Sequence, residues 1–175
     1  MVSLGLLTGT AAAQCVGTSC TVTISLPVSD VIRLDLSTST TALGSPGQAD
    51  FIAGWLVAPG DGPTATVKAN GPYTLSVTGN APSFSYAGSF TNPNKPSSAL
   101  TWAPGTGAAP GTCTGLATFG NSMGTAATLL SGSSGGPAIG VSAPSKKICY
   151  RTLWSFTSSP PGTYSLVVNF TLSGP

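Results

Sequence analysis

Residues 64–78 read TATVKANGPYTLSVT, and this stretch carries the clearest signal for the fold class. On both sides of Asn70-Gly71, apolar residues alternate with Thr, Ser and Lys, which is the period of a half-buried β-strand. Asn-Gly between two such runs is the strongest short signal for a β-hairpin. Pro72 favours an edge position or a slightly longer loop, because proline has no N–H to donate to a ladder. We therefore expect strands at Thr64–Ala69 and Tyr73–Thr78.

The same alternation recurs in both directions along the chain. Even-numbered apolar residues from Val22 to Leu36 predict one long strand, or two strands broken at Pro27. Towards the C-terminus, two alternating strands are expected at Ile148–Phe156 and, without a break, at Tyr164–Leu172. The continuously apolar run Phe51–Val57 predicts a strand buried on both faces. Shorter strands are expected at Ser83–Ala87, Ala99–Trp102, Cys113–Phe119, Ala126–Leu130 and Ala138–Ser142.

About ten strands separated by Gly, Pro, Ser and Asn turns predict an all-β protein, a two-sheet antiparallel sandwich. The chain has the length of one domain. We expect a single β-sandwich domain at residues 21–175, preceded by an N-terminal extension at residues 1–20.

Charged residues are rare in this chain. Only ten of its 175 residues are charged, and it has neither Glu nor His, whereas a typical domain is about one-quarter charged. The net charge of +2 is too small for a nucleic-acid partner. Beyond the first few residues, no apolar run reaches the roughly 18 residues of a membrane-spanning helix. A surface of hydroxyls and amides with few charges suits a protein that self-associates.

Catalytic and metal-binding motifs are weak. Gly132–Pro137 fits the G-x-S-x-G pattern, but a nucleophilic serine needs a base such as His, which this chain lacks. The acidic residues form neither a glycosidase-type pair nor a calcium loop. They are Asp30, Asp35, Asp50 and Asp61. We expect no enzymatic activity, no cofactor and no metal.

The four cysteines predict disulfides. A zinc site would need all four thiolates, because the chain has no His and no CxxC motif. Of the three possible pairings we favour a local Cys15–Cys20 bond and a long-range Cys113–Cys149 bond. Disulfides indicate an oxidising, extracytoplasmic compartment.

Two interpretations of the N-terminus stay open. Residues 2–7, followed by Ala11-Ala12-Ala13-Gln14, are typical of the end of a secretory signal with an A-x-A cleavage site, although a basic n-region is missing. Alternatively the segment stays in the mature chain, where Val2, Leu4 and Leu6 alternate as in a strand.

Aromatic residues offer a second kind of site. Trp154, Tyr150 and Tyr164 lie in the longest alternating strands, where burial in the core is expected. Tyr86 and Trp102 lie nearer to predicted loops. If the protein binds a surface glycan, these two are the candidate stacking platform.

Four segments together resemble a known class of proteins. Residues 22–27 (VTISLP), 32–36 (IRLDL), 70–77 (NGPYTLSV) and 161–172 (PGTYSLVVNFTL) are similar to strands of secreted bacterial β-sandwich cell-surface proteins, including pilus and fimbrial subunits. The resemblance implies an immunoglobulin-like sandwich that works by assembly or adhesion. In pilus-like families an N-terminal extension can complete the sheet of the next subunit by main-chain pairing.

The resulting functional hypothesis is a structural subunit of an extracellular bacterial filament or surface layer. Neighbouring copies would assemble by strand addition into a homopolymer at the cell surface. The alternative is a monomeric secreted carbohydrate-binding or adhesin module. The candidate assembly residues are Val2, Leu4 and Leu6 if the N-terminus is retained, and Val22, Ile24 and Leu26 if it is cleaved.

Overall fold

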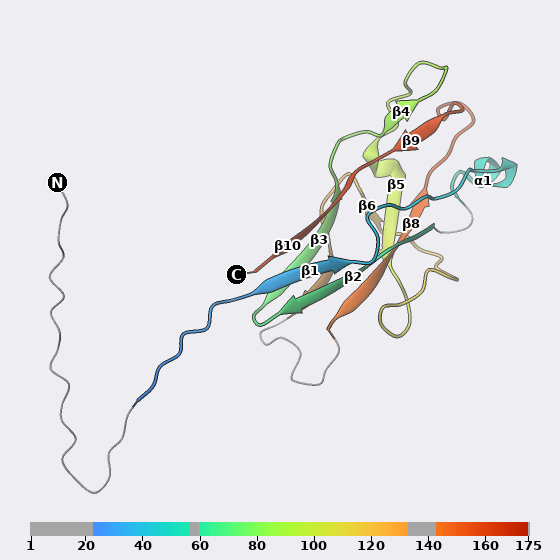
Figure 1. Cartoon of the computed structure of the whole chain (residues 1–175). Coiled ribbons are helices and arrows are strands. Elements are labelled where there is room, and N and C mark those ends of the chain that lie inside the picture. The colour runs from blue at the N-terminus through green and yellow to red at the C-terminus, as the bar shows by residue number, and fades with distance from the viewer. Residues whose placement is uncertain (1–22, 57–59, 133–142, 175) are drawn as a thin grey trace, which may run out of the picture.

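The computed structural model describes residues 23–56, 60–132 and 143–174, and β-strands dominate these ranges (Figure 1). This confirms the all-β class. Three predicted segments lie wholly or partly outside the described residues. They are the N-terminal extension at residues 1–20, the last residue of Phe51–Val57, and the strand Ala138–Ser142. The strands are β1 (Ile32–Leu36), β2 (Gly60–Ala69), β3 (Tyr73–Gly79), β4 (Ser85–Ala87), β5 (Leu100–Pro104), β6 (Asn121–Ser122), β7 (Ala127–Gly132), β8 (Ser145–Thr152), β9 (Thr163–Ser165) and β10 (Val168–Ser173), with helix α1 (Gln48–Ala53) and 3₁₀ turn η1 (Ser97–Ala99).

The strands form three antiparallel sheets. The largest has the order β1-β2-β8-β5-β6, the second has the order β10-β3-β7, and β4 pairs with β9. Apolar side chains from the two larger sheets meet in one core. The largest fully buried side chains are Trp102, Leu75, Met123, Ile148, Val67, Val77 and Cys149.

The predicted hairpin at Asn70-Gly71 is wrong, although both of its strands form. β2 pairs with β1 and β8, whereas β3 pairs with β10 and β7, so the turn connects two different sheets. A hairpin with a two-residue turn would pair Ala69 with Pro72. Odd-numbered residues of the first strand would then share a face with even-numbered residues of the second. Val67 and Leu75 would then point to opposite faces. In separate sheets, both side chains point into the shared core and are fully buried.

The predicted strand at Phe51–Val57 is also wrong, because its first three residues form the end of helix α1. Asp50 lies in the first turn, where its carboxylate accepts a hydrogen bond from the Gly47 N–H at 2.8 Å. Gly54 ends the helix in the left-handed conformation, with φ of +79°. Local start and stop signals therefore prevail over the apolar composition, and Ile52 remains exposed.

The strand predicted at Ile148–Phe156 begins earlier, at Ser145, and the strand predicted at Tyr164–Leu172 is divided into two. β8 ends at Thr152, and Phe156 is exposed. The alternation over residues 164–172 spans two strands in different sheets. β9 pairs with β4 and ends at Ser165, and β10 begins at Val168 and pairs with β3. The predicted strand Cys113–Phe119 is a turn and irregular segment without strand pairing.

Candidate functional site

The predicted strand from Val22 to Leu36 forms only in its second half, as β1. Residues 23–31, which we call the N-terminal arm, contain no regular element and run away from the body of the protein (Figure 1, blue). Ile24, Leu26 and Val28 on the arm are 88%, 83% and 75% exposed. Large apolar side chains exposed at alternate positions make this arm the candidate interaction site.

The arm is held to the body at its C-terminal end by Asn70. The Asn70 Oδ1 accepts a hydrogen bond from the Val31 N–H at 2.5 Å, and its Nδ2 donates one to the Ser29 carbonyl at 2.9 Å. A main-chain bond from the Asn70 N–H to the Val31 carbonyl, 3.2 Å long, completes the anchor. Gly71 leaves room for Asp30, because an added Cβ would lie 2.9 Å from the Asp30 Oδ1. The turn that the sequence predicts as a hairpin therefore anchors the arm.

The strand that follows the arm carries charges. Arg33 and Asp35 on β1 form an ion pair of 2.8 Å, and Lys68 on β2 lies 3.5 Å from the same carboxylate. The hydrogen bond from Arg33 lowers the pKa of Asp35 below its usual range. Within the described part of the chain, β1 has a strand partner on one side only, and charges on an edge strand oppose uncontrolled pairing. The arm carries one charge, Asp30, close to its anchor, and none beside Ile24, Leu26 and Val28.

Of the six candidate assembly residues, the structure places Ile24 and Leu26 together on the arm. Val2, Leu4, Leu6 and Val22 lie outside the described residues. Sequence reasoning missed Val28, which shares the even-numbered register of Ile24 and Leu26 beyond Pro27.

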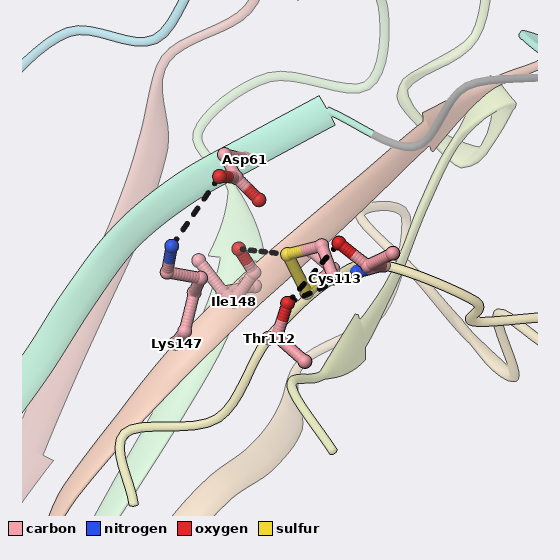
Figure 2. The surroundings of a disulfide bond; sticks show 7 residues. Asp61, Thr112, Cys113, Lys147 and Ile148 are labelled. Carbon is pink, nitrogen blue, oxygen red and sulfur yellow. Dashed lines mark hydrogen bonds and ion pairs between the residues drawn. A yellow bond between two sulfur atoms is a disulfide. The ribbon is translucent and has the colours of Figure 1, made fainter. Parts of the chain in front are cut away.

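The disulfide between Cys113 and Cys149 is present, as the sequence analysis favoured. It ties the irregular segment after β5 to the middle of β8, and both cysteines are buried. Figure 2 shows the Cys113 Sγ beside the Ile148 carbonyl, 3.9 Å away, and the ion pair of Lys147 with Asp61, 3.3 Å long, on the neighbouring strands. The Cys15–Cys20 pairing lies outside the described residues.

The proposed stacking platform of Tyr86 and Trp102 is wrong. Trp102 is fully buried in β5, where it pairs with Tyr150 on β8, because a bulky apolar ring at a central strand contributes most when it is removed from water. Tyr86 is half-buried in the small β4-β9 sheet. Its hydroxyl donates to the Pro161 carbonyl at 2.7 Å, and its ring packs 5.1 Å from that of Tyr164.

Sequence reasoning missed Lys95, a buried lysine. Its side chain is only 6% exposed, and its ammonium lies over the rings of Trp154 and Tyr164, 4.3 and 5.7 Å from their centroids. Burial lowers the pKa of Lys95 to about 8. The only sequence signal is a lone lysine between Pro93 and Pro96 in a stretch without other charges.

Other chemistry finds little support among the described residues. They contain no cluster of three or more His, Cys, Asp or Glu side chains that could hold a metal ion. None of the helices in the described ranges is long and apolar enough to cross a membrane. The serine motif at residues 132–137 lies almost entirely outside these ranges. In comparisons with known proteins, no family model, curated protein or solved structure matches the chain.

Proposed function

We propose that this protein is a structural subunit of an extracellular bacterial filament or surface layer, in which each copy donates a strand to its neighbour. The exposed apolar arm, residues 23–31, carries this proposal. The immunoglobulin-like arrangement of the two larger sheets and the cell-surface location are part of the same proposal.

Apolar and polar residues alternate along the arm as in a β-strand, but the arm pairs with no sheet in the described structure. Ile24, Leu26 and Val28 would share one face of an extended strand, opposite Thr23 and Ser25. In the single chain these side chains are exposed to water. Burying each of them against a neighbour would contribute about 1.5–3 kcal/mol towards the cost of association.

The arm also satisfies the geometric needs of strand addition. Its anchor at Asn70 and Val31 fixes where the arm leaves the body, which reduces the entropy lost when the arm binds. Pro27 removes one main-chain donor, so the arm fits best at a sheet edge where that position faces solvent. The receiving edge belongs to a neighbouring copy, and main-chain hydrogen bonds would add to the apolar contacts.

The experiment compares the full chain with the triple variant Ile24→Ser, Leu26→Ser, Val28→Ser. The matched control exchanges residues on the opposite face of the arm, Thr23→Ser with Ser25→Thr. Size-exclusion chromatography with light scattering and negative-stain microscopy measure assembly, and circular dichroism measures folding.

We expect filaments or oligomers for the wild type and the control, and a folded monomer for the triple variant. A triple variant that assembles as the wild type does would refute the proposal, as would a wild type that remains monomeric at every concentration and temperature tried.

A further inference from the structure

Lys95 is a buried cation without an anionic partner in the described structure. The chain has only four acidic side chains, and the ion pairs of the described residues join Asp35 to Arg33 and Lys68, and Asp61 to Lys147. Asp50 caps the first turn of α1, and Asp30 lies beside Gly71. None of these described ion pairs includes Lys95.

The contacts that Lys95 does make are all to neutral groups. Its ammonium donates hydrogen bonds to the Leu153 carbonyl and, over 3.5 Å, to the Ser159 hydroxyl. The faces of Trp154 and Tyr164 supply weaker electrostatic attraction. An ammonium has three N–H donors, so these two bonds leave one donor available. A buried charge with only neutral partners is costly, and a bound anion would offset that cost.

Lys95 lines a pocket with suitable size and composition. The pocket has a volume of about 220 Å³, well above the roughly 10–15 Å³ that a single water molecule requires. Pro93, Pro96 and Leu153 supply apolar surface, and Ser155 and Ser158 add polar atoms. The space accommodates a carboxylate with a short carbon skeleton, or the acidic end of a larger molecule.

We propose that the Lys95 pocket binds the carboxylate group of a small organic acid or of an acidic sugar residue. The carboxylate accepts a charge-assisted hydrogen bond from the free donor of Lys95, and the carbon skeleton lies against the proline and leucine side chains. Binding is non-covalent and makes no use of the N-terminal arm, so it does not depend on the proposed assembly.

The experiment uses the full chain with ¹³C-labelled lysine, because its four lysines give few signals to resolve. Propionate and glucuronate are titrated at pH 7 and constant ionic strength, with propionamide and glucose as their neutral counterparts. Lys68, which is exposed on β2, serves as the internal control for nonspecific ionic effects.

We expect a saturable shift of the Lys95 side-chain signals with a carboxylate, binding at least tenfold weaker for its neutral counterpart, and no saturable shift at Lys68. A saturable response to propionate alone identifies a free small acid, and one to glucuronate, with or without propionate, identifies an acidic sugar; each of these outcomes supports the site. No saturable shift with either carboxylate up to about 100 mM would overturn it.

Two variants then test the role of the charge. Lys95→Met removes the ammonium and keeps an apolar side chain, and Lys68→Met is the matched control. We expect ligand-observed NMR to show at least a tenfold loss of carboxylate binding in the first variant only. Unchanged binding in Lys95→Met would overturn the proposal; should that variant fail to fold, the labelled wild type decides the question alone.

Discussion

The side chain of Asn70 fixes the position of Val31 through an N–H···O bond of 2.5 Å, although the two residues are 39 positions apart in the sequence. The Asn70→Ala substitution removes this bond and the one to Ser29. Both are exposed, so we expect a loss of about 1 kcal/mol in the free energy of unfolding. Urea denaturation measures that loss, and hydrogen exchange should show faster exchange of the Val31 amide.

Asn169→Ala is the control for this prediction, because the Asn169 amide bonds to Asn80, away from the arm. It should leave exchange at Val31 unchanged. Equal protection of Val31 in the Asn70→Ala variant and the wild type would contradict the anchoring role.

The Cys113–Cys149 bond closes a loop of 36 residues. Replacing both cysteines by alanine should lower the free energy of unfolding by about 3–4 kcal/mol, since the cross-link no longer restricts the unfolded chain. Urea denaturation under non-reducing conditions tests this. Equal transition midpoints for the variant and the wild type would show that the bond does not contribute to stability.

Trp102 is fully buried at the centre of the core. Trp102→Ala should lower the free energy of unfolding by about 3–5 kcal/mol, because the large cavity cannot collapse completely. Trp55→Ala is the matched control, since Trp55 is 43% exposed, and it should cost less than half as much. Denaturant titration distinguishes the two, and similar losses would argue against a core role for Trp102.

Lys95 should make the protein more stable in mild alkali. Its pKa is about 8 in the folded protein and about 10.4 in the unfolded chain, so between these values the unfolded chain holds the extra proton. The free energy of unfolding therefore rises with pH across this window, by roughly 1–2 kcal/mol between pH 8 and 10. The chain has no His to titrate just below this window, and its other lysines and its tyrosines titrate at the upper end of it.

From about pH 9 upward the tyrosines oppose this gain, because their pKa in the unfolded chain is about 10. Burial raises the pKa of Tyr73, Tyr150 and Tyr164, so the unfolded chain loses those protons first and stability falls again. Urea titrations at intervals from pH 7 to 10 should show the rise in the wild type and a flatter profile in Lys95→Met. A wild-type profile that is flat or falls from pH 8 would contradict the burial of the ammonium.

The candidate site was only partly predictable. The even-numbered register of Ile24 and Leu26 predicted an apolar strand. It did not predict that this segment extends away from the body of the protein. Lys95 could not be found, since its burial depends on Trp154 and Tyr164, which are 59 and 69 positions further along the chain. The prediction for Trp102 was wrong for a related reason, because its burial depends on the facing sheet, whose Leu75 and Val77 share the core with it.

By itself, the sequence determined the all-β class and the inward-facing residues of β2 and β3, because alternation with period two is a local property of an extended chain. It also determined the near absence of ionic chemistry. Only the tertiary structure decided which strands pair: the strands that carry Val67 and Leu75 are predicted to pair as a hairpin, yet they belong to different sheets. Pairing is non-local, and the arrangement that buries both apolar faces is the more stable one.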